Sequence, residues 1–298
     1  MFAGIGPALV DYIHCIDEYP ERGGHAVVKS TIRSAGGAGA NVIYGLSRYG
    51  IRCSFYSTIG RDDDAEFFKK SMDGVYLKLA VTHEKTGKVD IYVDRIGERT
   101  FFVHPNASGV LKLNMDDEDY RMNDYFYLDP FPSKDSLNVH IKIAKKAKKF
   151  GKKVILSMSY PYVIMGFDML KHLLRYTDIV ITSKAEFVLL NVSEEEILNF
   201  ADLFVLTMGK DGAKALTKDE IYYHPAYKVK VVDTTGAGDA FAVGFFYCYL
   251  KGYDLKTCLK IGNFVASYNI QQFGARNFPP LHEVENKIGH DREDVRMF

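Results

Sequence analysis

The 298-residue sequence has few cysteines, no excess charge of either sign and no long apolar run. Its four cysteines are scattered, without a Cys-x-x-Cys pair or a Cys/His cluster, which argues against a zinc site and a disulfide framework. Because the formal net charge is zero, no whole-chain field draws the protein to nucleic acid or to an acidic membrane. The longest apolar run, residues 240–250, is far shorter than the roughly 20 residues that span a bilayer.

Two common nucleotide-binding motifs are also missing. The phosphate loop Gly-x-x-x-x-Gly-Lys-Ser/Thr does not occur, and Gly4-x-Gly6 lacks the third glycine and the helix of a dinucleotide-binding turn. The sequence starts with a strand-like pattern and no basic segment ahead of an apolar stretch, so no signal peptide is expected. Together with the cysteine usage, these features predict a cytoplasmic enzyme.

What the sequence does contain is a regular alternation of short β-branched runs with helix-length stretches. This alternation predicts an α/β fold, with a mostly parallel sheet flanked by helices on both faces, in a single domain over residues 1–298. Strands are expected at residues 1–10, 53–59, 125–128, 153–156, 179–182 and 203–207, and helices at 40–49 and 64–73.

Two segments break the alternation. Residues 12–34 contain short extended stretches, and residues 86–104 predict a hairpin in which alternate residues are apolar and Gly97 forms the turn. A small β-layer inserted at these two places would form a lid over a site. Its outer apolar residues can alternatively lie in the interface of a homodimer.

The most informative segment is the glycine-rich run Asp-Thr-Thr-Gly-Ala-Gly-Asp, from Asp233 to Asp239. It lies between an extended run at residues 229–232 and an apolar helical run at 241–250. A strand, a glycine turn and a helix together aim backbone N–H groups and the positive end of the helix dipole at an anion. Beside those amides, the Asp239 carboxylate can accept the proton of a hydroxyl that attacks a phosphorus. In the alternative interpretation, Asp239 only caps the helix.

This run resembles the C-terminal signature of the ribokinase-like (PfkB-type) family of carbohydrate and nucleoside kinases. Residues 36–41, Gly-Gly-Ala-Gly-Ala-Asn, resemble the N-terminal signature of that family, at the expected place ahead of a helix. Further resemblances are spread over nearly the whole chain: Gly4-Ile5-Gly6 with Asp11, residues 86–100, residues 207–212, Asn263 with Ala266-Ser267, and Gly274-Ala275. The resemblance implies the ribokinase-like fold and Mg²⁺-dependent transfer of the ATP γ-phosphoryl group to an alcohol.

The resemblance also implies a role for each matching residue. The catalytic base would be Asp239, and the anion hole would be Gly236, Ala237 and Gly238. Substrate hydroxyls would contact Asp11, Gly37 and Asn41. The ATP site would be lined by Thr207, Gly209, Gly212 and Asn263. For Asn41, the alternative role is a helix N-cap.

The metal-binding stretch departs from the family pattern. Where the family usually has Asn-x-x-Glu to organise Mg²⁺ and its waters, this chain has Ser183-Lys184-Ala185-Glu186. Glu186 is kept, and a serine can hydrogen-bond a metal-bound water, so we expect altered metal affinity with activity retained. In the family, a carboxylate at the position of Asp233 and the loop near Gly274 can also hold a monovalent cation such as K⁺.

The sequence leaves the acceptor open. Asp11-Tyr12-Ile13 and Pro20 resemble archaeal nucleoside kinases of the family, and a lid with apolar residues can enclose a base; these residues are Tyr12, Cys15, Ile16, Phe101 and Phe102. The first hypothesis is therefore 5′-phosphorylation of a ribonucleoside, and the second is phosphorylation of a free sugar such as ribose or fructose. A phosphosugar acceptor ranks third, because no arginine fork for its phosphate can be placed. A sugar or nucleotide sensor without turnover would not need the intact Asp239.

A lysine-rich stretch at residues 142–153 raises a nucleic-acid alternative. Apolar residues recur there at helical spacing, so the lysines are expected on the solvated face of a helix that covers the sheet. We therefore expect a small-molecule substrate, with neither nucleic acid nor a membrane as a partner.

Overall fold

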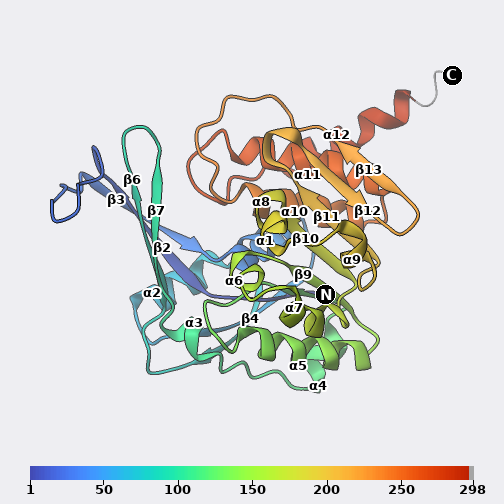
Figure 1. Cartoon of the computed structure of the whole chain (residues 1–298), viewed down its shortest axis with the longest axis horizontal. Coiled ribbons are helices and arrows are strands. Elements are labelled where there is room, and N and C mark those ends of the chain that lie inside the picture. Colours follow the sequence, from blue (N-terminus) through green and yellow to red (C-terminus); the bar gives the residue numbers. More distant parts are fainter. Residues whose placement is uncertain (295–298) are drawn as a thin grey trace.

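A computed structural model describes residues 1–294, which form a large α/β body and a smaller sheet beside it (Figure 1). The nine strands of the large sheet lie in the order β13-β12-β11-β10-β9-β8-β1-β4-β5. From β11 to β5 all neighbours run parallel, and β12 and β13 extend one edge antiparallel, which confirms the mostly parallel sheet. The strands are β1 (Phe2–Ile5), β4 (Cys53–Ile59), β5 (Tyr76–Val81), β8 (Tyr125–Leu128), β9 (Lys153–Ser157), β10 (Ile179–Ser183), β11 (Leu203–Thr207), β12 (Ala213–Leu216) and β13 (Ile221–His224).

Helices cover both faces of this sheet because the side chains of each strand alternate between them. In β8, Tyr127 packs into one core, and Phe126 and Leu128 pack into the other. The Tyr127 face carries α1 (Ala38–Arg48), α2 (Asp63–Ser71), α10 (Ala237–Leu250), α11 (Leu255–Asn269) and α12 (Leu281–Asp294). The opposite face carries α4 (Asp117–Met122), α5 (Ser136–Lys149), α6 (Tyr160–Val163), α7 (Phe167–Leu174), α8 (Lys184–Leu190) and α9 (Glu194–Leu198). The remaining short helices are α3 (Ala107–Val110) and η1 (Gly209–Asp211).

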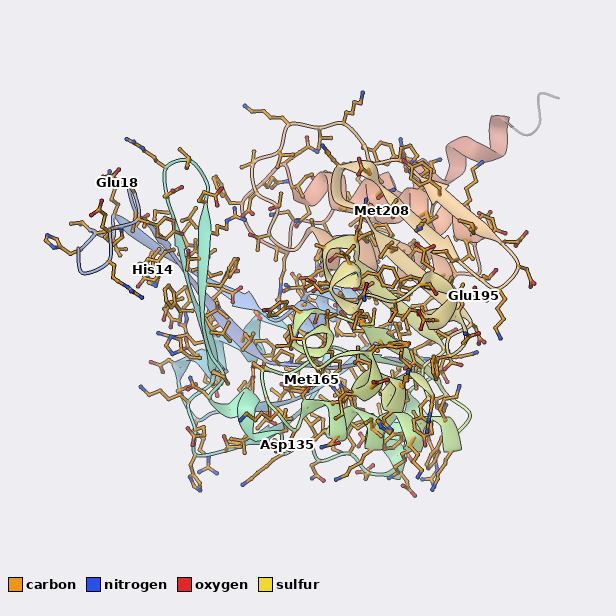
Figure 2. All side chains as sticks on the ribbon, viewed as in Figure 1. His14, Glu18, Asp135, Met165, Glu195 and Met208 are labelled. Carbon is orange, nitrogen blue, oxygen red and sulfur yellow. The ribbon has the colours of Figure 1, made fainter. Side chains whose placement is uncertain are left out.

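The smaller sheet, called the lid sheet below, has four strands in the order β3-β2-β6-β7. They are β2 (Leu9–Cys15), β3 (Ser30–Gly36), β6 (Gly87–Val93) and β7 (Arg99–His104). The antiparallel pairing of β6 with β7 confirms the predicted hairpin. The lid sheet stands at one side of the body (Figure 1), and in Figure 2 the labelled His14 and Glu18 mark the side opposite Glu195.

Two predicted strands are wrong. The strand expected over residues 1–10 is two strands in different sheets, because the chain leaves the large sheet at Gly6-Pro7, where Ala8 N donates to Ser57 Oγ at 2.9 Å and not to a sheet neighbour. The extended run at residues 229–232 is not a strand, since it has no strand beside it. Its last amide, that of Val232, donates instead to the carbonyl of Ile270 at 2.8 Å.

Among residues 1–294, none of the helices combines the length and the apolarity that a membrane span requires.

Candidate active site

The glycine turn at the start of α10 forms a cradle of backbone amides. Gly236 is the N-cap of the helix with φ 70°, and a Cβ placed on it would lie 2.5 Å from the Cβ of Ala275, so only glycine fits there. The N–H of Ala237 donates to Thr234 O at 3.2 Å. Within residues 1–294, the N–H groups of Gly236, Gly238 and Asp239 donate to no backbone acceptor. A Cβ on Gly238 would meet nothing within 4 Å, so the space beside this residue is open. We call the N–H groups of Gly236, Gly238 and Asp239 the amide cradle; the N–H of Ala237, which was expected in the anion hole, is already used within the turn.

Asp239 lies beside the cradle and does not cap its own helix. It is the third residue of α10, and no side chain caps that helix. Its Oδ2 accepts a hydrogen bond from Asn41 Nδ2 at 2.9 Å. Asn41 belongs to α1, whose N-cap is Gly37, so the alternative role of Asn41 as an N-cap is also wrong. The two helices that follow the two signatures thus hold their polar side chains against each other.

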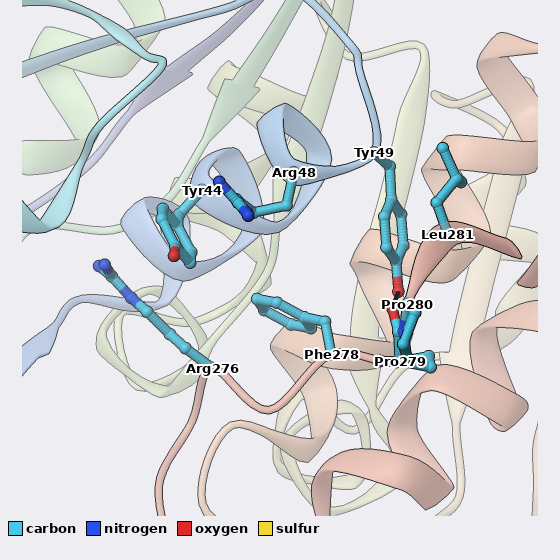
Figure 3. Close-up of a pocket in the computed structure, with 8 residues that line it drawn as sticks. All are labelled: Tyr44, Arg48, Tyr49, Arg276, Phe278, Pro279, Pro280 and Leu281. Atoms are coloured by element: carbon cyan, nitrogen blue, oxygen red, sulfur yellow. Dashed lines mark hydrogen bonds between the residues drawn. The ribbon is translucent and has the colours of Figure 1, made fainter. Parts of the chain in front are cut away.

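Arg276, which the sequence analysis missed, holds Asn41 in its contact with Asp239. Its Nε donates to Asn41 Oδ1 at 2.8 Å, its Nη1 donates to Ser71 O at 3.0 Å, and its guanidinium lies 4.7 Å from the centre of the Tyr44 ring (Figure 3). Because a guanidinium can only donate, it holds the oxygen of the Asn41 amide toward itself and leaves the NH₂ group for Asp239. We call this chain of contacts, from Arg276 to Asn41 to Asp239, the relay. It presents the carboxylate of Asp239 in one orientation.

Three carboxyl groups around this relay have raised pKa values. Burial raises the pKa of Asp239 to about 6, against the lowering effects of the Asn41 hydrogen bond and of Arg276. Burial also raises the pKa of Asp11 to about 7; Arg276 lowers it and Asp239 raises it further. Burial raises the pKa of Asp129 to about 7 as well. A base with a pKa near 6 is ionised at neutral pH and still accepts a proton readily.

Of the residues expected on the substrate side, Asp11 lies near Asp239, and Gly37 allows two backbone segments to approach closely. A Cβ on Gly36 would lie 2.3 Å from Asp11 Oδ1. Strand β2 of the lid sheet therefore holds the Asp11 carboxylate directly against the N-terminal signature at residues 36–41. Gly37 has φ 96°, and a Cβ on it would lie 2.4 Å from the carbonyl oxygen of Pro7. Both glycines are required by this close approach. Contact of Asp11, Gly37 and Asn41 with a substrate stays a prediction.

Asp129 is a second residue that the sequence analysis missed. It follows β8 directly, is only 3% exposed, and accepts a hydrogen bond from the N–H of Gly39 at 2.8 Å. The position of an acidic residue just after a buried parallel strand was the available signal, because such strand ends line the ligand-binding edge of an α/β sheet.

Replacing Asp129 with asparagine is expected to remove a pH-dependent loss of stability. A carboxyl group whose pKa is raised in the folded state contributes stability that is present at low pH and is lost as the pH rises through about 7. Between pH 5 and pH 8 the wild type should therefore lose about 2–3 kcal/mol of unfolding free energy that the Asp129→Asn variant keeps. Denaturant unfolding of both proteins at the two pH values measures this, and an equal difference between them at pH 5 and at pH 8 would contradict the assignment.

Glu186 takes part in capping the N-terminus of α8 and lies near Asp129 and Asp239. Ser183 and Glu186 form a capping box on α8, in which Glu186 N donates to Ser183 Oγ at 3.2 Å and Ser183 N donates to Glu186 Oε2 at 3.3 Å. Ser183 Oγ also donates to Glu186 Oε2 at 2.7 Å, and Glu186 Oε1 accepts from Tyr160 N at 2.8 Å. The charge of Glu186 nevertheless raises the pKa of both Asp129 and Asp239. Among the side chains of residues 1–289, no group of three or more His, Cys, Asp or Glu could hold a metal directly. A role of Glu186 in holding Mg²⁺ through water stays a prediction.

The residues expected at the ATP site lie at the end of β11 and beside α11. Thr207 is the last residue of β11, and Gly209 begins η1. Gly212 has φ 94°, and a Cβ on it would lie 2.2 Å from the carbonyl oxygen of His224. Asn263 of α11 donates to that same carbonyl at 2.9 Å. Gly212 and Asn263 thus meet at His224, where the Asn263 amide anchors the chain after β13, and their contact with ATP stays a prediction.

Asp233 is tied to three different parts of the chain. Its Oδ1 accepts from Thr235 N at 2.6 Å and lies 2.7 Å from Nη1 of Arg99, and its Oδ2 accepts from Gly274 N at 2.9 Å. Although burial acts in the opposite direction, these amides and the Arg99 charge hold the pKa of Asp233 below its ordinary value. Arg99, the third functional residue that the sequence analysis did not single out, reaches Asp233 from the lid sheet.

Comparison with known proteins places this site in a family. Residues 3–282 match the pfkB family of carbohydrate kinases. The chain is 29% identical over 300 residues to the nucleoside kinase of Methanocaldococcus jannaschii, covering 97% of this chain and 96% of that protein. The crystal structure of that archaeal member of the ribokinase family aligns with a TM-score of 0.79 at 26% identity, covering 97% of this chain and 99% of that one. Arabidopsis thaliana ribokinase, solved with ribose and ATP, aligns at 23% identity with a TM-score of 0.81, covering 96% and 98%. The chain therefore belongs to the pfkB family and is a phosphotransferase with an alcohol acceptor, a carbohydrate or nucleoside kinase.

Proposed function

We propose that the protein transfers the γ-phosphoryl group of ATP to the 5′-hydroxyl of a ribonucleoside. The supporting observation is the order of side chains along β2. Asp11, Ile13 and Cys15 are alternate residues of this strand and therefore share one face. Ile13 and Cys15 line a largely apolar cleft at the lid sheet, together with Ile32, Ile91, Val93 and Phe273, and the cleft is completed by Arg99, Asp233 and Thr235. A nucleoside suits this order, with its ribose hydroxyls at Asp11 and its base in the cleft, whereas a free pentose has no apolar part to fill it.

In this proposal the relay supplies the base, and the amide cradle binds the transferred phosphoryl group. Asp239, held by Asn41, takes the proton of the 5′-hydroxyl as the oxygen meets the γ-phosphorus. The free N–H groups of the amide cradle and the N-terminus of α10 stabilise the charge that develops on the transferred group. Glu186 would hold Mg²⁺ through water, and the ion would supply positive charge against the phosphates. In-line transfer requires little more than this positioning and charge stabilisation.

A free sugar is the second candidate, and the lid sheet provides the observation in its favour. Of the apolar residues expected to enclose a base, Tyr12, Ile16 and Phe102 lie away from the cleft. Ile16 and Phe102 line the opposite side of the lid sheet, and Tyr12 donates to Asp64 Oδ1 at 2.6 Å. That part of the expectation is wrong, because neighbouring strand residues face opposite sides. The cleft therefore offers mainly aliphatic contacts to a base, with Phe273 as an exposed aromatic at its edge.

An ATP-consumption screen over nucleosides, pentoses, hexoses and phosphosugars tests the proposal. Burying an apolar group the size of a large side chain is worth about 1.5–3 kcal/mol, so the best nucleoside should exceed ribose about 10- to 10²-fold in kcat/KM. Ribose or fructose turning over as well as any nucleoside would instead favour a sugar kinase.

A pair of variants on β3 tests where the base binds. Ile32→Ser places a hydroxyl in the cleft and should raise the KM for the nucleoside while leaving turnover of ribose unchanged. The matched control is Thr31→Ser, on the other face of the same strand, which keeps the hydroxyl that hydrogen-bonds His14 Nδ1.

A further inference from the structure

We propose that the Arg99 guanidinium takes the place of a monovalent cation at Asp233, so that the lid sheet itself supplies the positive charge behind the amide cradle. The proposal rests on phosphoryl transfer by this chain and not on the identity of the acceptor. Its consequence is a kinase that needs no K⁺. It also makes the position of the lid sheet and the charge at the cradle depend on each other.

Three donors already bind the Asp233 carboxylate, and one of them is a charged guanidinium. Its two oxygens accept from Thr235 N and Gly274 N, and Arg99 Nη1 lies 2.7 Å from Oδ1. Arg99 Nη1 also donates to Thr235 Oγ1 at 2.7 Å. The guanidinium thus joins the carboxylate to Thr235, and the Gly274 amide joins the carboxylate to the loop near Gly274.

Arg99 also balances the negative charge of Asp233. Asp233 is 4% exposed and the Arg99 side chain is 16% exposed, so the pair is largely removed from water. A buried carboxylate requires one compensating positive charge, and Arg99 provides it. A K⁺ ion beside this pair would add an uncompensated charge next to a guanidinium, which is unfavourable in such a partly buried environment.

Arg99 belongs to the lid sheet, whereas Asp233 belongs to the body. Arg99 is the first residue of β7, an edge strand of the lid sheet, and it pairs in register with Val93 of β6. Thr235, which it contacts, immediately precedes Gly236 and is held from the other side by Asn269 Nδ2, which donates to Thr235 O at 2.8 Å. Movement of β7 away from the body would leave Asp233 without its counter-charge. A closed lid sheet and an ordered cradle therefore stabilise each other.

Kinetics in the absence of alkali cations test the proposal. The full chain is assayed for ADP release with its best acceptor in tetramethylammonium buffer, with and without 100 mM KCl. We expect the wild type to change less than about twofold, and the Arg99→Met variant to lose about 10- to 100-fold of kcat, the effect of losing charge-assisted hydrogen bonds. KCl should restore a large part of that loss. Arg95→Met, at an exposed arginine in the turn of the same hairpin, should behave as the wild type in both buffers.

A second readout does not depend on turnover. In thermal unfolding without substrates, KCl should raise the Tm of Arg99→Met relative to tetramethylammonium chloride at equal ionic strength, and should leave the Tm of the wild type unchanged. Arg99→Lys keeps a positive charge and should need no K⁺; it also serves if the methionine variant does not fold.

The outcomes separate this proposal from the proposed acceptor. Stimulation of the wild type by KCl of tenfold or more, or full activity of Arg99→Met in cation-free buffer, would overturn the role of Arg99. A wild type that phosphorylates a sugar but no nucleoside would overturn the acceptor and leave the cation test intact.

Discussion

Replacing Asp239 with asparagine is expected to lower kcat by about 10²- to 10⁴-fold while leaving ATP binding nearly intact, because the variant loses the general base and little else. An asparagine at this position has the same shape, and its oxygen can still accept the hydrogen bond that Asn41 Nδ2 now donates to Asp239 Oδ2 at 2.9 Å. The amide cradle and Gly238 are untouched. A single-turnover assay with saturating ATP and the best acceptor measures the effect.

The pH profile distinguishes loss of a base from a general disturbance of the site. Burial raises the pKa of Asp239 to about 6, so the wild-type rate should rise as the pH increases through about 6 and then level off. In Asp239→Asn the residual rate should lack that limb. Asp168→Asn, which removes a 95% exposed carboxylate from the first turn of α7, is the matched control and should retain both the rate and the limb. Wild-type turnover by Asp239→Asn would remove this residue from the mechanism.

Strands that are buried on both faces were the most predictable part of the fold. The bounds of β4, β8 and β11 agree with the expected ranges, because a short apolar run between turn residues has few other ways to bury itself. The first strand failed for a local reason. Gly6 and Pro7 move the chain from the large sheet to the lid sheet, and an apolar run does not say which sheet its residues join. The run at residues 229–232 failed because a strand requires a partner, and none lies beside it.

The site was predictable where its residues are adjacent in sequence and not where they come from distant segments. The glycine turn and Asp239 are visible as one motif, since strand ends and helix starts have local signals. Arg99 and Arg276 have no such signal, since their contacts with Thr235 and Asn41 span 136 and 235 residues of sequence. Their roles depend on which loops the sheet topology brings together. A lone arginine at the start of a strand or in a loop carries no signal in the sequence until its partner is known.

Replacing Gly238 with valine is expected to abolish most activity in a protein that still folds. This result would distinguish a catalytic role of the amide cradle from a structural role in forming α10. A Cβ at Gly238 meets nothing within 4 Å, and the residue precedes Asp239 in the first turn of α10 with no positive φ, so a side chain there causes no backbone strain. Unfolding temperature should therefore stay within a few degrees of the wild type. The valine side chain would occupy the space in which a phosphate approaches the free N–H groups. Since losing one such donor typically costs about 10²- to 10³-fold, kcat should fall by at least about 10²-fold.

The matched variant is Gly236→Ala, two residues earlier in the same turn. Gly236 has φ 70° and its added Cβ would lie 2.5 Å from the Cβ of Ala275, so this smaller substitution should lower the unfolding temperature, whereas Gly238→Val should not. The pair thus inverts the usual relation between side-chain size and damage. A thermal melt and a kcat measurement on both variants decide the matter: a folded Gly238→Val protein with wild-type turnover would show that phosphate does not approach these amides, and the assignment of the amide cradle to the transferred group would then be wrong.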